Sequence, residues 1–309
     1  MLKRTIRRAV VTGAGSMLGA AVTGCLLEQG AAVTAVLRPG GENAAGLSEE
    51  TPGLTIVRAD LSAPEAIPGE GIDAWFHFAW AGTYGEGRHD AALQKKNAAF
   101  SVRALLHAKE LGVRVFFFAG SQAEYGPVEG VIGPDTPLNP VTEYGKGKLL
   151  AEREIREISE EIGIDAVFAR ILSVYGPYDH DYTLVMSSIG AFLSGEEMAF
   201  TPGEQDWDYL YSEDAAKAII RIAEAGVPGK AYPLGSGKTR KLRDYIRDIR
   251  DEANPDAPLS FGGRDYPPGQ VMHLSADISD LIRDTGYTPD TGFLRGIRKT
   301  IEYYREKRR

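Results

Sequence analysis

Residues 12–19 read TGAGSMLG and follow directly after the apolar run Ala9-Val10-Val11. A glycine-rich turn between a buried strand and a helix can bind a dinucleotide, because amides at the helix N-terminus face the pyrophosphate and glycines permit its close approach. One glycine lies out of place, since Gly15 stands one position early and Ser16 occupies the middle of the motif. Serine is small and caps helices well, so the turn tolerates it. A glycine-rich loop without a cofactor is the alternative.

Apolar periodicity places this turn in a larger α/β pattern. Short runs of β-branched and aromatic residues alternate with longer helical segments, which predicts βαβ units. Expected strands cover residues 8–13, 31–39, 54–61, 72–82, 113–121 and 164–174, and expected helices cover 17–30, 91–112 and 145–163. The strands are apolar on both faces, as a sheet covered on both sides requires. We therefore predict a Rossmann-type, doubly wound parallel sheet with a smaller C-terminal substrate-binding region.

The pattern changes after Gly176-Pro177, where Pro and Gly become frequent. Residues 229–237 again have the composition of a strand, which is expected to return to the main sheet. The sequence thus predicts a dinucleotide-binding domain over 1–176, rejoined by 208–236, and a substrate-binding domain over 177–207 and 237–309.

The composition is that of a globular chain, with 309 residues, 43% apolar content and a formal net charge of −8. This charge disfavours a nucleic-acid surface, which needs clustered Lys and Arg to neutralise phosphates. No stretch has the apolar length of a membrane span, and the N-terminus lacks the apolar core of a signal peptide. Cys25 is the only cysteine, so no intrachain disulfide can form. We expect a cytoplasmic protein that binds neither nucleic acid nor membrane.

Six further stretches make the turn far more specific. They are ADL (59–61), FHFAWAG (76–82), AGSQAEYG (119–126), PLNPVTEYGKGKLLAE (137–152), RILSVYGP (170–177) and DWDYLYSEDAAKAI (206–219). Over nearly the whole chain, this set resembles the extended short-chain dehydrogenase/reductases, the superfamily of nucleotide-sugar epimerases and dehydratases. That family carries TGxxGxxG at the turn, so Gly13 and Gly19 match its outer glycines.

Tyr144 and Lys148 match the YxxxK of that family, and Ser121 matches its strand-end Ser or Thr. Positions four apart lie on one helix face, so the Lys148 ammonium can lie near the Tyr144 phenol and lower its pKa. The resemblance implies that Ser121 hydrogen-bonds the reacting oxygen while Tyr144 exchanges its proton. The alternative is an aromatic residue and a lysine on a solvated helix, with a plain serine at a strand end.

The residues after Ser121 bear on dehydration. Dehydratases of the family place an acid, typically Glu, two residues after the Ser or Thr, whereas Gln122 and Ala123 follow here. Glu124 stands one place further, and alternation of side chains along the backbone predicts that it points elsewhere. Loss of water is therefore disfavoured.

The residues at the end of the second expected strand indicate which nicotinamide cofactor is bound. NAD-specific members usually carry an acid there, which accepts hydrogen bonds from the adenosine ribose. Leu37 occupies that position and Arg38 follows. Because an acid would repel a 2′-phosphate and an arginine would bind it, NADP(H) is favoured over NAD(H). A solvated strand-end arginine is the alternative.

The resemblance also implies the other cofactor contacts. Asp60 resembles the residue that contacts adenine, and Asn97 stands on the central helix where many members carry Asn. The expected cofactor-binding set is Gly13, Gly15, Ser16, Met17, Leu18, Gly19, Arg38, Asp60, Leu61, Ala79, Trp80, Ala81, Asn97, Tyr144 and Lys148.

The resemblance weakens at the substrate side. Ser173 replaces an Asn found in many members, and Trp207 replaces an Arg that often holds the diphosphate. Arg264 is the nearest candidate for a second family arginine, Lys238 and Arg240 are substitutes, and Gln122 is expected near the sugar. The segment YDHDY (178–182) lacks good metal-ligand spacing, so we predict a substrate-side loop and no metal; His77 is expected to be structural.

These residues predict an NAD(P)-dependent enzyme that acts on a carbinol or ketone carbon of a sugar, which is expected to be nucleotide-linked. A 4-ketoreductase that consumes NADPH is the favoured interpretation. The alternative is a 4-epimerase that retains its cofactor, followed by a nucleotide-sensing protein without turnover, against which the Ser121, Tyr144 and Lys148 set argues. A homodimer is expected.

Overall fold

A computed structural model describes residues 4–40 and 47–308 of the chain. Its centre is a seven-stranded sheet with the strand order β12-β7-β5-β4-β1-β2-β3. All neighbouring strands in it run parallel. The strands are β1 (Arg8–Thr12), β2 (Ala32–Leu37), β3 (Leu54–Arg58), β4 (Ala74–His77), β5 (Val115–Ser121), β7 (Asp165–Ile171) and β12 (Ala231–Leu234). The predicted Rossmann-type parallel sheet is confirmed.

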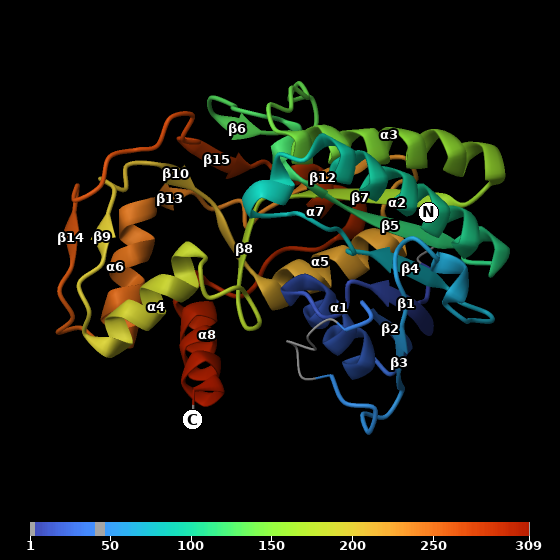
Figure 1. Cartoon of the computed structure of the whole chain (residues 1–309), viewed down its shortest axis with the longest axis horizontal. Coiled ribbons are helices and arrows are strands. Elements are labelled where there is room, and N and C mark those ends of the chain that lie inside the picture. The colour runs from blue at the N-terminus through green and yellow to red at the C-terminus, as the bar shows by residue number, and fades with distance from the viewer. Residues whose placement is uncertain (1–3, 41–46, 309) are drawn as a thin grey trace.

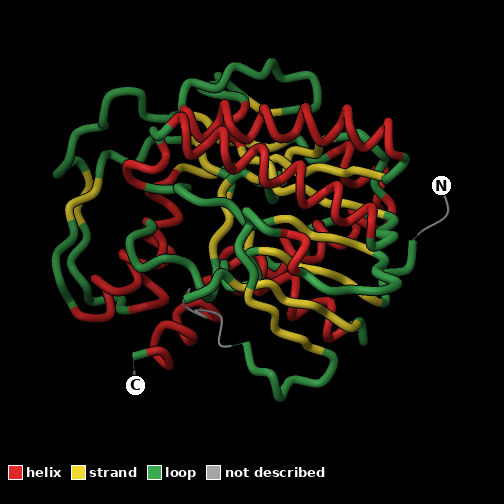
Figure 2. Tube along the Cα trace, turned by 45° about the vertical axis from the view of Figure 1, so that its right-hand side comes forward, coloured by secondary structure: helices red, strands yellow, loops and turns green. Residues whose placement is uncertain are grey.

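Helices cover both faces of this sheet (Figure 1, Figure 2). The helices α2 (Ala91–Glu110) and α3 (Glu143–Ile162) pack side by side on one face, and α1 (Met17–Glu28) and α5 (Ser212–Ala225) cover the other. Strand side chains alternate between the two layers. Phe76 and Phe117 belong to the core under α1 and α5, whereas Trp75 and Phe116 belong to the core under α2 and α3.

The C-terminal half builds a smaller region, drawn at the left of Figure 1. Its helices α4 (Leu184–Ser194), α6 (Leu242–Ala253) and α8 (Phe293–Lys307) bury a separate core around Phe192, Ile246 and Ile301. Short strands complete it: β6 (Val131–Ile132), β8 (Ser173–Tyr175), β9 (Ala199–Phe200), β10 (Asp206–Trp207), β11 (Tyr209–Tyr211), β13 (Arg240–Lys241), β14 (Ser260–Phe261) and β15 (His273–Ala276). They pair in the orders β13-β10-β15-β6, β11-β8 and β14-β9.

Two segments tie this region to the large sheet. Strand β6 lies within residues 1–176, yet it pairs with β15. Helix α7 (Ser279–Thr285), from within residues 237–309, packs on α5 and β12. Packing thus joins the two predicted domains. Their separate roles, in binding a dinucleotide and a substrate, stay predictions.

The expected strand over 164–174 is divided in the structure. Leu172 donates its amide to the Leu234 carbonyl (2.9 Å), and the chain then leaves β7 and pairs as β8 with β11. The expected strand over 72–82 ends at His77, after which the backbone turns away from the sheet. In the part of the chain that the structure describes, three short 3-10 helices lie in the loops: η1 (Pro64–Ala66), η2 (Gly85–Arg88) and η3 (Gln122–Glu124).

The parallel order brings the carboxyl ends of β1, β4 and β5 to one edge of the sheet, where ligands of open α/β sheets bind. The TGAGSMLG turn, the loop with η2 and the turn η3 therefore meet there. Among the residues described, no helix has the length and apolar character needed to cross a membrane.

Candidate active site

The turn after β1 is shaped by two glycines that admit no side chain. Gly13 has φ +74°, and a Cβ there would lie 2.8 Å from the Ala79 amide nitrogen. A Cβ on Gly19 would lie 2.2 Å from the Gly13 carbonyl oxygen. Ser16 caps α1, since its Oγ accepts from the Gly19 amide (3.2 Å) and donates to the Gly13 carbonyl (2.8 Å). A close-packed turn at the N-terminus of a 12-residue helix fits a pyrophosphate.

The loop after β4 borders this turn. The buried Asn97 side chain holds it, because its Nδ2 donates to the Ala81 carbonyl (2.8 Å) and its Oδ1 accepts from the Ala81 amide (3.2 Å). Both the oxygen and the nitrogen of the Asn97 side-chain amide therefore hydrogen-bond to backbone. Its assignment as a cofactor contact stays a prediction, and the structure adds a role in fixing residues 79–81.

Trp80 and Gln94 link this loop to α3. The Trp80 indole N–H donates to Gln94 Oε1 (2.7 Å), and the Lys148 ammonium lies 3.9 Å from the centre of a Trp80 ring. Gln94, which is 1% exposed, was not a candidate in the sequence because nothing marks one polar residue on a long helix. Trp80 thus contacts one of the predicted catalytic residues directly.

Ser121, Tyr144 and Lys148 meet at the end of β5. Tyr144 lies in the first turn of α3, which Thr142 caps, and the Ser121 side chain lies close enough to its phenol to lower the pKa of the phenol. The Ser121 oxygen accepts from the Ala123 amide (3.2 Å). Lys148 lies one turn after Tyr144 and donates to the Ala119 carbonyl (2.8 Å). The structure therefore brings the three predicted catalytic side chains to one place.

The pKa values of Tyr144 and Lys148 differ from the expectation that the lysine lowers the pKa of the phenol. Burial raises the pKa of Tyr144 to about 12, although the Ser121 hydrogen bond acts in the opposite direction. Burial also lowers the pKa of Lys148 to about 7. The Lys148 ammonium lies 5.9 Å from the centre of the Tyr144 ring and is directed at Ala119 and Trp80. The spacing on one helix face is as predicted, but desolvation outweighs the expected lowering of the Tyr144 pKa.

Comparison with known proteins identifies the family. The model of the NAD dependent epimerase/dehydratase family matches residues 9–235, most of the chain. The chain belongs to this family. It is accordingly an enzyme of the extended short-chain dehydrogenase/reductase type.

Individual relatives are distant. The chain is 27% identical over 253 residues to an uncharacterised UDP-glucose epimerase of Bacillus subtilis, YtcB, covering 79% of this chain and 78% of the relative. A UDP-N-acetylglucosamine 4-epimerase from Methanobrevibacter ruminantium superposes with a TM-score of 0.88 at 23% identity, over 99% of this chain and 100% of that one. DesIV, a dTDP-glucose 4,6-dehydratase from Streptomyces venezuelae solved with NAD, gives 0.83 at 23% identity over 97% and 98%. Both structures share the fold.

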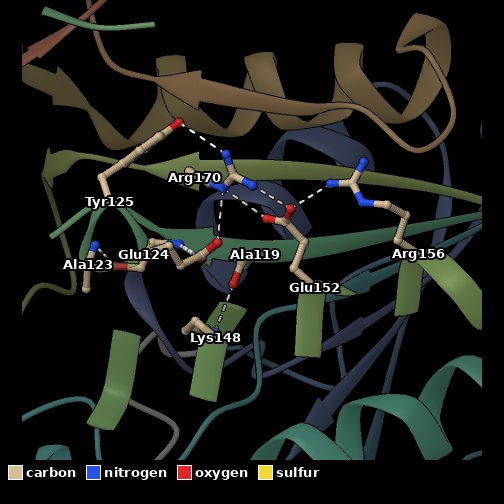
Figure 3. A network of polar contacts seen from close by, with 9 residues as sticks. Ala119, Ala123, Glu124, Tyr125, Lys148, Glu152, Arg156 and Arg170 are labelled. Carbon is tan, nitrogen blue, oxygen red and sulfur yellow. Dashed lines mark hydrogen bonds and ion pairs between the residues drawn. The ribbon is translucent and has the colours of Figure 1, made fainter. Parts of the chain in front are cut away.

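Beneath the family's catalytic residues lies a buried network of charges (Figure 3). Arg170 on β7 lies between two carboxyl groups, with Nε 3.0 Å from Glu124 Oε2 and Nη2 2.5 Å from Glu152 Oε1. Glu124 Oε1 also accepts the Ser121 amide (2.6 Å). Burial and the Glu152 charge raise the pKa of Glu124 to about 8, whereas Arg170 overcomes burial and keeps the pKa of Glu152 below its usual value.

This network decides where Glu124 points. Its side chain is completely buried, and its carboxyl is engaged by Ser121 and Arg170 rather than directed toward a substrate. Gln122 is half-buried and Ala123 carries no acid. The turn after Ser121 thus provides no free carboxyl for eliminating water, as predicted from the sequence.

Arg38 and Asp60 lie at the carboxyl ends of the neighbouring strands β2 and β3. Both are exposed, and Asp60 Oδ1 accepts from the Ser62 amide (2.8 Å) and hydroxyl (2.5 Å). These hydrogen bonds lower the pKa of Asp60, and the nearby Arg38 charge adds to the effect. Leu61, half-buried, follows. The positions suit an adenosine site, and the contacts themselves stay predictions.

The expected substrate residues divide into two groups. Ser173 and Trp207 meet, since the indole N–H donates to the serine oxygen (2.9 Å). Arg264 is exposed after β14 and, within the described part of the chain, shares no hydrogen bond or ion pair with Gln122, Ser173 or Trp207. Arg240 is neutralised by Asp248 (2.7 Å), which weakens it as a substitute for a diphosphate contact.

His77 and the segment 178–182 are placed by local hydrogen bonds. His77 Nδ1 lies 2.9 Å from Thr12 Oγ1 and Nε2 lies 3.1 Å from Ser101 Oγ, and burial lowers its pKa to about 3. Asp179 accepts from the His180 amide and the Thr183 hydroxyl. No cluster of His, Cys, Asp and Glu suited to a metal occurs within residues 4–40 and 47–308.

One residue that sequence reasoning missed lies against the ring of Tyr144. Arg88, at the end of η2, places its guanidinium carbon 4.5 Å from the centre of the Tyr144 ring. Its sequence setting, YGEGRHD, reads as a solvated turn. Only the path of the loop after β4 brings it to Tyr144.

Proposed function

We propose that the chain is a nucleotide-sugar 4-epimerase in which Tyr144 is the acid and base. The arrangement of Ser121, Tyr144 and Lys148 beside a dinucleotide-type turn carries this proposal. A bound nicotinamide supplies the hydride chemistry. Tyr144 takes the proton of the sugar hydroxyl and later returns it, and the Ser121 hydroxyl donates to the oxygen that becomes a carbonyl.

Two observations support epimerisation over dehydration. Relatives named as epimerases match over most of the chain, including a UDP-N-acetylglucosamine 4-epimerase and a UDP-glucose epimerase. Dehydratases also occur among the relatives, but here Glu124 is engaged by Arg170 and Ser121, so the turn after Ser121 provides no free acid. Nucleotide sugars are therefore the proposed substrates, and C4 is the proposed reacting carbon.

The second candidate is the 4-ketoreductase favoured by the sequence. Arg38 supports it: the side chain is exposed at the end of β2, where an arginine binds a 2′-phosphate, and NADPH serves net reduction. We propose NADP(H) as the preferred cofactor on the same ground. NAD is the cofactor bound in the DesIV structure, so the preference is a property to test on this chain.

One assay separates the candidates. Purified protein is incubated with UDP-glucose, UDP-N-acetylglucosamine and 4-keto-6-deoxy nucleotide sugars, and products and reduced nicotinamide are followed together. An epimerase inverts C4 of an ordinary nucleotide sugar with no net change in cofactor. A ketoreductase consumes stoichiometric NADPH with the keto sugars only. Formation of a 4-keto-6-deoxy product from UDP-glucose contradicts both and shows that Gln122 and Ala123 do not prevent dehydration.

A homodimer is also proposed. Helices α2 and α3 lie side by side on the outside of the sheet and leave Leu106 42% and Leu150 37% exposed. Two copies of such a face can form a symmetric interface. Sedimentation velocity tests this: a single species at 33.5 kDa over the micromolar range contradicts it.

A further inference from the structure

Arg88 is a half-buried cation without a carboxylate partner. Its guanidinium lies over the Tyr144 ring at 4.5 Å and donates to the Thr83 carbonyl (3.1 Å). Within residues 4–40 and 47–308 it forms no ion pair, whereas Lys146 forms an ion pair with Glu143 (Nζ to Oε1, 2.6 Å). The field of Arg88 is therefore not cancelled at close range.

A buried clamp fixes the loop that carries Arg88. The Gln94 amide nitrogen donates to both the Gly82 carbonyl (2.9 Å) and the Gly87 carbonyl (2.7 Å), which joins the two ends of the loop. Gln94 also accepts from the Trp80 indole N–H. The Trp80 ring packs edge to face against the Tyr144 ring, with 6.3 Å between the ring centroids. Arg88 directly follows Gly87, whose carbonyl accepts from the buried Gln94 side chain. This buried contact fixes the loop that carries Arg88 over Tyr144.

The groups around the Tyr144 phenol show which cation acts on it. Burial raises its pKa, and the Glu124 carboxyl from η3 and the Tyr84 phenol from the loop before η2 act in the same direction. The Ser121 hydrogen bond from β5 and the Arg88 charge lower it. Lys148, on the same helix, directs its ammonium at Ala119 and Trp80. Arg88 is consequently a cation that opposes desolvation of the phenolate.

We propose that Arg88 is a positioning residue for acid–base catalysis: it stacks on the Tyr144 ring and stabilises the phenolate that receives the substrate proton. In that step the hydroxyl O–H of the sugar breaks and the phenol O–H forms, while Arg88 neither gains nor loses a proton. The inference rests on the proposed role of Tyr144 and adds a second cation to Lys148.

Steady-state kinetics over pH test the inference. Removing a unit charge near a partly buried phenol moves its pKa by about one unit. In Arg88→Gln and Arg88→Met we expect the acidic limb of the kcat/KM profile to move up by about one pH unit, with about tenfold lower kcat below it. KM should change less than twofold, and Arg88→Lys should recover most of the loss. The matched control is Lys146→Gln, an exposed cation two residues from Tyr144, and its profile should not move.

If the acidic limb of the kcat/KM profile does not move in either Arg88→Gln or Arg88→Met, the inference is overturned. A raised KM with an unchanged limb also overturns it, because it would make Arg88 a substrate-binding residue. Circular dichroism of each variant establishes that it is folded, and the Met variant keeps the length of the stem if the Gln variant fails.

A direct titration separates this inference from the proposed function. The full chain is labelled with 3-fluorotyrosine, whose more acidic phenol brings the titration into range, and the ¹⁹F signal of Tyr144 is assigned by its loss in Tyr144→Phe. Its midpoint should move up by about one pH unit in Arg88→Gln and stay unchanged in Lys146→Gln. Equal midpoints overturn the role of Arg88. Near-normal turnover of Tyr144→Phe instead overturns the proposed function, whatever the titration shows.

Discussion

A single guanidinium at the end of β2 is expected to set the choice of cofactor. Arg38 is exposed and lies near Asp60, so its charge is partly compensated even before a ligand binds. A charge-assisted contact to a 2′-phosphate contributes about 1.5–3 kcal/mol. Arg38→Ala should therefore weaken NADP(H) binding roughly 10- to 150-fold and leave NAD(H) nearly unchanged. Fluorescence titration with both cofactors measures this.

The control for Arg38 is one strand away. Arg58 is exposed at the end of β3, where its register partner is Leu37, so Arg58→Ala removes a similar charge from the same edge of the sheet. It should affect the two cofactors alike. Equal losses of NADP(H) and NAD(H) in Arg38→Ala would show that Arg38 does not read the 2′-phosphate.

The phenol of Tyr144 is the second residue whose role can be isolated. Tyr144→Phe keeps the ring between Trp80 and Arg88 and removes only the hydroxyl that is proposed to exchange the proton. Turnover should fall about 10²–10⁴-fold, with cofactor affinity within a few-fold of the unchanged chain. Rapid-quench product analysis and the same fluorescence titration measure the two quantities. Retained turnover would remove Tyr144 from the mechanism.

At the scale of elements, Glu124, Glu152 and Arg170 join η3, α3 and β7 beneath the site (Figure 3). The raised pKa of Glu124, about 8 against 4.5, means that the native state holds a proton that the unfolded chain releases. Its contribution to stability is therefore complete below about pH 4.5 and is lost as the pH rises toward about 8. The depressed pKa of Glu152 acts in a different window, because that contribution is lost only as the pH falls below 4.5.

Glu124→Gln tests this assignment. The amide cannot lose a proton; its oxygen can accept from the Ser121 amide and its nitrogen can donate to Glu152, but that nitrogen cannot accept from Arg170 Nε as the carboxyl oxygen does. Relative to the unchanged chain, the free energy of unfolding of the variant should therefore rise by on the order of 1–3 kcal/mol between pH 5 and pH 8. Urea unfolding at both pH values measures the difference. Glu124→Ala, which leaves Arg170 and the Ser121 amide without this partner, should be destabilised at both; a Gln variant whose stability relative to the unchanged chain does not rise between pH 5 and pH 8 contradicts a protonated Glu124.

Elements were predictable from the sequence where one periodicity runs long enough. Helices α2 and α3 begin within two residues of the expected 91–112 and 145–163, because their apolar spacing and caps agree. The two-residue strands β9, β10 and β14 carry too few side chains to show alternation. Tyr144 and Lys148 were predicted because they match the YxxxK of the family, and their spacing of four residues places both on one helix face. Arg88 was not, because it reaches Tyr144 only through the loop that Gln94 closes.

At the scale of the whole molecule, the large sheet and the C-terminal region are joined by more than a chain connection. Strand β6 adds to β15, and α7 packs on α5 and β12. Lys230, just before β12, pairs with Asp280 (2.7 Å) and Asp284 (2.6 Å) of α7. Each of these contacts breaks if either part unfolds alone, so the two parts should lose structure together.

Differential scanning calorimetry should accordingly show one cooperative transition for the whole chain. A ligand that binds only the native state at 100 times its Kd adds about 2.7 kcal/mol to the free energy of unfolding. NADPH at that level should therefore move the single transition upward by on the order of 5 °C. Arg38→Ala at the same NADPH concentration should move much less, because its affinity is lower. Two transitions, of which NADPH shifts only one, would show that the contacts of β6 and α7 do not couple the cofactor-binding sheet to the C-terminal region, and that the two parts fold as independent domains.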